Sequence, residues 1–107
     1  MPAIMSNGSP RPVARVGHGD FWFPDGLSEV VAHSDGRYLS VTLTGISTGA
    51  GKVWVEEFAC DERDACFAAL RIWLHGIGAT GNAHAAQHVA NWAGEVSERV
   101  IAALYSN

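Results

Sequence analysis

The stretch DGRYLSVTLT, residues 35–44, decides the fold class. Its apolar residues alternate with hydroxyl-bearing residues, and this period of two predicts a strand with one buried face. The Asp35-Gly36 pair at its start is a hairpin signal, because both residue types tolerate the left-handed backbone of a tight turn. The sequence therefore predicts an antiparallel pair of strands, with residues 27–33 as the first and 38–44 as the second.

The segments on either side extend this pair into a small sheet. Residues 52–59 alternate but have apolar residues on both faces, which predicts a further strand without fixing its core face. The three aromatic residues at 21–23 are strongly β-prone. The glycine-rich segment 45–51 is typical of a long hairpin connection. We expect three to four strands.

The apolar period changes at Asp61 from two to about 3.6, which predicts a helix. Asp61 is a suitable N-cap, and Glu62 and Asp64 place negative charge where the helix dipole favours it. Gly76 is the expected end of this helix. A second helix is predicted from apolar residues at steps of four, three, four and four: Val89, Ala93, Val96, Val100 and Leu104.

The order of these elements predicts an α+β fold, with a small antiparallel sheet of three to four strands followed by two helices packed on one face. The 107 residues suffice for one compact domain and not for two. Residues 1–12 contain three of the four prolines and show no periodicity, so we predict a flexible N-terminal arm. Residues 13–107 then form the single domain.

Composition and charge exclude several classes of protein. The net charge is −4 and the seven Lys and Arg residues are scattered, which argues against direct binding of nucleic acid. No apolar run approaches the roughly 20 residues of a membrane span, and we see no secretory signal, so we expect a cytoplasmic location. Phosphate-binding glycine loops and nucleophile elbows are missing from the sequence. We therefore predict neither enzyme activity nor a cofactor.

His84 and His88 are spaced four apart on the second predicted helix, so both face the same way. Such a pair can grip a divalent metal, which makes a small metal-binding domain one alternative. Against it, Cys60 and Cys66 have the wrong spacing for a zinc knuckle, and Cys66 falls on an apolar stripe. We predict a solvated helix face and no metal site.

The candidate partner-binding surface combines acidic and aromatic residues. Exposed aromatic side chains beside charges are typical anchors for a protein partner, and Trp22 and Trp54 are the candidates here. The alternative is that all four tryptophans lie in the core, where Trp73 is expected in either case. The acidic residues bunch at the junction between the last strand and the first helix: Glu57, Asp61, Glu62 and Asp64.

The chain also has a recognisable layout. A hairpin turns at Asp35-Gly36, a glycine-containing connection leads to a strand ending in Glu57-Phe58, and a helix closes with Trp-Leu-His-Gly at 73–76. A glycine-rich turn and an amphipathic helix follow. In this layout, residues 30–100 resemble one of the small phage-encoded anti-CRISPR inhibitors that bind Cascade-type surveillance complexes. The resemblance implies a non-catalytic protein that blocks a nucleic-acid-binding machine by sitting on its protein subunits.

The predicted function is therefore that of a non-catalytic protein-binding inhibitor, with an anti-CRISPR protein as its specific form. An immunity or antitoxin-like protein that plugs a toxin is the alternative from another class. Both would use a rigid surface whose aromatic anchors and acidic groups face a basic partner. The expected partner is a protein with a basic, nucleic-acid-handling surface, and neither nucleic acid nor membrane is expected to bind directly.

Overall fold

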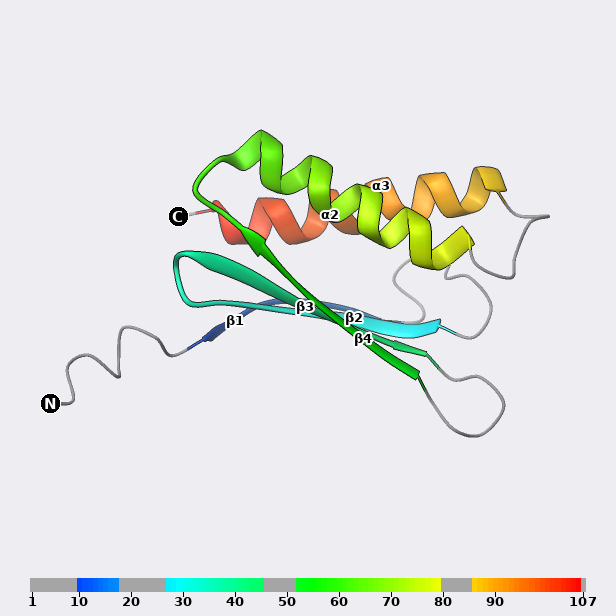
Figure 1. Ribbon diagram of the computed structural model, residues 1–107, viewed down its shortest axis with the longest axis horizontal. Coiled ribbons are helices and arrows are strands. Elements are labelled where there is room, and N and C mark those ends of the chain that lie inside the picture. Colours follow the sequence, from blue (N-terminus) through cyan, green and yellow to red (C-terminus); the bar gives the residue numbers. More distant parts are fainter. Residues whose placement is uncertain (1–9, 18–26, 46–51, 80–85, 107) are drawn as a thin grey trace, which may run out of the picture.

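The computed structural model describes residues 10–17, 27–45, 52–79 and 86–106. These residues form, in chain order, β1 (Arg11–Gly17), β2 (Leu27–Ser34), β3 (Tyr38–Gly45), β4 (Lys52–Ala59), α2 (Arg63–Ala79) and α3 (Ala86–Leu104). The strands make one antiparallel sheet in the order β1-β2-β3-β4. The predicted α+β fold, with a sheet followed by two helices, is confirmed (Figure 1).

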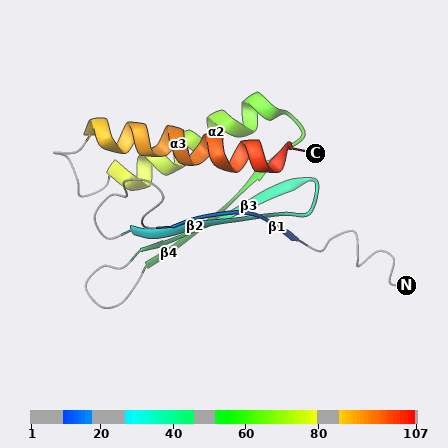
Figure 2. The same cartoon turned by 180° about the vertical axis from the view of Figure 1, so that it is seen from behind.

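Both helices cover the same face of the sheet. α2 packs against β4 and α3 against β1, and the two helices pack against each other. α2 and β4 lie at the front in Figure 1, whereas α3 and β1 lie at the front in the reverse view of Figure 2. No described helix or strand covers the other face, which is called the open face below.

The β2–β3 hairpin forms at the predicted turn. Gly36 has φ of 97°, in the region that favours glycine. The Oδ1 atom of Asp35 accepts hydrogen bonds of 2.9 Å from the backbone N–H groups of Arg37 and Tyr38. The bond from Tyr38, and to a lesser extent that from Arg37, lowers the pKa of Asp35. The side chain that shapes the turn therefore also stays ionised.

The core lies between the helices and the alternating residues of the two central strands. Leu39, Val41 and Leu43 of β3 are fully buried, as predicted. The predicted stripe of α3 is confirmed from Val89 to Val100, and it gains Trp92, the largest fully buried side chain among the described residues. The remaining buried core residues include Val16, Val30, Ala32, Cys66, Leu70 and Leu74.

Trp73 lies at the edge of this core. Its side chain is half-buried and meets Phe58 of β4 edge to face, with ring centroids 5.7 Å apart. The expectation that Trp73 packs in the core thus holds only for part of its side chain, because β4 is the last strand of the sheet and offers a neighbour on one side.

β1 is a strand that the sequence did not indicate. It includes Arg11 and Pro12, which were assigned to the arm, and Pro12 pairs with His33 of β2. A proline is tolerated there because β1 is an edge strand, and the register shifts between Pro12 and Ala14. The rest of the predicted arm and the aromatic segment 21–23 lie outside the described residues.

α2 differs from its predicted bounds at both ends. The carbonyl of Glu62 accepts the first helical hydrogen bond, from the N–H of Cys66 at 2.9 Å, so the N-cap is Glu62 and not Asp61. The helix also continues through Gly76 to Ala79. A glycine inside a helix costs about 1 kcal/mol, which the burial of neighbouring Leu74 offsets.

Among the residues that the structure describes, replacing Trp92 with alanine should be the most damaging single truncation. Because Trp92 is 1% exposed, we expect Trp92→Ala to lower the free energy of unfolding by about 3–5 kcal/mol in a urea titration. Trp73→Ala is the matched control and should cost clearly less, since part of that ring faces solvent. Equal losses for the two variants would contradict the placement of the core.

Tyr105 fastens the end of α3 to the β4–α2 junction, because its hydroxyl donates a 2.6 Å hydrogen bond to the carbonyl of Cys60. Burial raises the pKa of Tyr105 to about 12, from about 10 in an unfolded chain. The stability that Tyr105 contributes is thus complete below pH of about 10 and is lost as the pH rises through about 12. We expect Tyr105→Phe to be about 1 kcal/mol less stable at neutral pH, and this difference from wild type to shrink in alkaline urea titrations.

Candidate functional site

An exposed tyrosine stands at the hairpin end of the sheet. Tyr38 precedes the buried Leu39, so its side chain lies on the open face, where it is 48% exposed. It pairs across the strands with Ala59 of β4, whose small side chain leaves the ring uncovered. The backbone of Tyr38 is also fixed, because its N–H donates a hydrogen bond to the carboxylate of Asp35.

Acidic side chains flank the tyrosine on two sides. One hollow beside the ring is lined by Asp35, Glu57 and His33. A second hollow is lined by Arg37, Ala59 and Asp61. Tyr38 borders both hollows and therefore stands between them. We call Tyr38, Asp35, Glu57 and Asp61 the Tyr38 surface.

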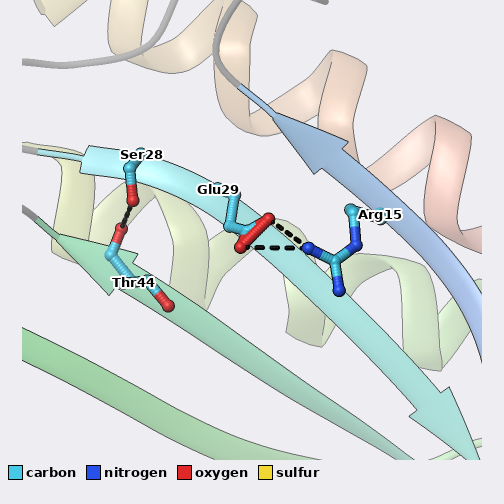
Figure 3. Close-up of polar contacts among 4 residues, drawn as sticks. All are labelled: Arg15, Ser28, Glu29 and Thr44. Atoms are coloured by element: carbon cyan, nitrogen blue, oxygen red, sulfur yellow. Dashed lines mark hydrogen bonds and ion pairs between the residues drawn. The ribbon is translucent and has the colours of Figure 1, made fainter.

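The negative charge of the open face is concentrated at this surface. Glu29, further along β2, is neutralised by Arg15 of β1, whose Nη1 lies 2.7 Å and 3.2 Å from the two carboxylate oxygens. Figure 3 shows this pair on the face opposite the helices, together with the 3.0 Å hydrogen bond from Ser28 to the carbonyl of Thr44. In the part of the chain that the structure describes, Glu57 and Asp61 form no ion pair.

Two of the four predicted acidic residues belong to the Tyr38 surface, namely Glu57 and Asp61. Asp64 points elsewhere: it lines a pocket between α2 and α3 with Phe67. Its carboxylate lies 3.9 Å from the guanidinium of Arg63, a weak and exposed pair. Glu62, the N-cap residue of α2, is exposed and lines neither hollow.

The tryptophans do not supply the exposed aromatic group. Trp54 lies on the helix side of β4 and is half-buried against the core, and Trp22 lies outside the described residues. Sequence analysis did not single out Tyr38, although the alternation along β3 places its side chain on the face opposite to that of Leu39. Its position directly after the Asp-Gly turn places it at the tip of the sheet.

The described residues contain no group of three or more His, Cys, Asp or Glu side chains that could hold a metal ion. His88 is exposed on α3, and its predicted partner His84 lies outside the described residues. Cys60 and Cys66 are buried free thiols, and burial raises the pKa of Cys66. A thiol with a raised pKa is mostly protonated at neutral pH, which makes it a poor nucleophile.

Comparisons with known proteins add no neighbour to this description. The chain matches no protein family, no curated protein and no solved structure. A search of the described helices for a long, apolar segment that could cross a membrane found none.

The two cysteines should resist modification in the folded protein. Cys60 and Cys66 are 7% and 1% exposed, so we expect an aromatic disulfide reagent to react with them only slowly. In urea both thiols should react at once, which provides the control. Fast reaction of either thiol under native conditions would contradict this placement.

Proposed function

We propose that this protein is a non-catalytic inhibitor that binds a protein partner through the Tyr38 surface. The observation that supports the proposal is the exposed ring of Tyr38 with Asp35, Glu57 and Asp61 around it. Tyrosine is enriched among the few residues that dominate binding energy at protein interfaces. The three carboxylates outnumber the single guanidinium of Arg37 that lines the second hollow, and this net negative charge favours a partner surface rich in Lys and Arg.

The rigidity of the surface favours a binding role. Tyr38 and Glu57 stand on paired strands, and Asp35 is fixed by two backbone hydrogen bonds. Little side-chain and loop entropy is then lost on association, so more of the contact energy remains as affinity. The charges also speed encounter with a basic partner.

In its specific form, the proposal is that the partner is a protein subunit of a Cascade-type surveillance complex, and that the chain acts in the cytoplasm as an anti-CRISPR protein. A surface that binds DNA phosphates is basic, so an acidic protein seated on it excludes the DNA. The layout of residues 30–100 supports this form. An immunity protein that covers the basic cleft of a nuclease toxin would use the same chemistry and is the alternative outcome of the test.

The test is a competition experiment with a purified Cascade-type complex and a fluorescent target DNA. We expect loss of DNA binding at a stoichiometric amount of the protein. Tyr38→Ala should weaken inhibition by about 30-fold, equivalent to about 2 kcal/mol. Glu57→Lys should slow association and reduce its salt dependence.

Glu98→Lys is the matched control, because it makes the same change of charge at an exposed position of α3, away from the Tyr38 surface. It should inhibit like wild type. An equal loss of inhibition in Glu57→Lys and Glu98→Lys would contradict binding through the Tyr38 surface and would indicate an effect of net charge. Neutralisation of a nuclease toxin without effect on the complex would favour the immunity protein, and inhibition at substoichiometric amounts would contradict binding as the mechanism.

A further inference from the structure

One edge of the sheet is open and the other is protected. β4 is the last strand in the sheet order, and no described element pairs with its outer edge. At the opposite edge, β1 has Pro12 and a shift in register, two features that discourage further strand pairing. β4 contains no proline, and its pairing with β3 runs without a register shift over all eight residues.

The backbone groups that β4 presents at its outer edge can be assigned. The N–H of Cys60 donates to the carbonyl of Arg37 on the β3 side, at 3.1 Å. Hydrogen-bonded and non-hydrogen-bonded pairs alternate along an antiparallel ladder, so the even-numbered residues of β4 bond to β3. The odd-numbered residues, among them Val53 and Val55, therefore direct their N–H and C=O groups outward.

The same edge has most of the exposed large apolar side chains of the described residues. Among the described residues, four large apolar side chains are exposed, and three of them lie along this edge: Val53 (62%), Val55 (58%) and Ile72 of α2 (66%). The fourth is Tyr38, which belongs to the surface described above. Exposed apolar groups beside unpaired strand backbone favour the addition of another strand.

We propose that two copies of this chain associate through their β4 strands into one eight-stranded antiparallel sheet. The two-fold axis passes between Trp54 and the Trp54 of the second copy. In this register Lys52 lies directly opposite Glu56 of the other copy, and Val53 lies opposite Val55. The association therefore contains two opposite-charge pairs, two valine pairs and the pair of Trp54 residues at the axis. The outward N–H and C=O groups of Val53 and Val55 bond to those of the opposing valine.

Charge selects this register over its neighbours. Lys52 and Glu56 both lie on the helix side of β4 and are both exposed. A shift of the axis to Glu56 places two glutamates face to face, and a shift to Lys52 does the same with two lysines. A shift to Val55 sets Val53 against Glu57. Only the axis at Trp54 gives directly opposed Lys–Glu pairs, each worth up to about 1 kcal/mol.

The flank of α2 on this side suits a second copy as well. Trp73 contacts β4, whereas Asp64 and Phe67 line the pocket toward α3, which fixes the orientation of the helix. Helical spacing defines a flank of α2 that lies beyond Trp73, on the side of the helix away from α3. This flank has no charged side chain. This flank consists of Ala65, Ala69, Ile72 and Gly76, all exposed. Strand pairing brings the two α2 flanks toward each other on the same face of the joined sheet.

Sedimentation equilibrium with charge variants tests the association. We expect a monomer–dimer equilibrium for wild type. Lys52→Glu and Glu56→Lys should each raise the dissociation constant at least about tenfold, because two attractive pairs become repulsive. The double variant Lys52→Glu/Glu56→Lys should return to within about threefold of wild type, because it restores both pairs.

The matched control is Lys52→Glu/Glu57→Lys. It has the same net charge as the rescuing double variant, but its new lysine lies on the open face and is not opposite the glutamate introduced at position 52 of the other copy. It should not restore the dimer. A monomer at all concentrations, or equal rescue by both double variants, would overturn the proposal.

Cross-linking tests the register directly. Trp54→Cys places the new thiols of the two copies opposite each other in a non-hydrogen-bonded pair. Its Cα atoms are about 4.5 Å apart, within the range of a disulfide, so mild oxidation should give a disulfide-linked dimer. Wild type, whose two cysteines are buried, should give none. Val55→Cys is the comparison, since it is self-paired only in the shifted register. Stronger cross-linking of Val55→Cys than of Trp54→Cys would overturn the proposed register.

Discussion

Burial of a single face of the sheet is the constraint on which the rest of the structure depends. Leu39, Val41 and Leu43 leave water by facing the helices, because no other described element covers them. Their burial sets the register of β3, and the register in turn decides the face of every residue on its neighbours. The open face and the outer edge of β4 are the consequences, since two helices cover one side of four strands.

The turn links this constraint to the proposed function. The Asp-Gly pair lets β3 start immediately after β2, and the carboxylate of Asp35 that closes the turn also remains charged. Tyr38 is the first residue after the turn, so the period of two places it on the open face at the tip of the sheet. Glu57 and Asp61 reach it only because β4 pairs with β3 in the observed register. The proposed binding surface is thus assembled by strand pairing.

Local sequence predicted those elements whose own periodicity is strong. β3 and the stripe of α3 followed from spacing, and Trp92 could have been added, since it stands three residues after Val89 and four before Val96. β1 could not be predicted, because Arg-Pro-Val-Ala-Arg has no alternation and the strand exists through its pairing with β2. The acidic residues were grouped by closeness in sequence, which cannot separate Asp61 from Asp64. Asp61 precedes the N-cap and lies outside α2, whereas Asp64 lies in its first turn, so the start of the helix turns the two side chains toward different surfaces.

The two proposed interactions are compatible because they use opposite halves of β4. The two-fold axis at Trp54 lies five residues from Ala59, which pairs with Tyr38. At about 3.3 Å per residue along the strands and about 4.8 Å between strands, the two Tyr38 residues of a dimer would stand about 36 Å apart, both on the open face of the joined sheet. A partner with two equivalent basic sites at that spacing would gain from the high effective concentration of the second surface. A partner with one site would bind monomer and dimer alike, so the dependence of inhibition on dimerisation reports the number of sites on the partner.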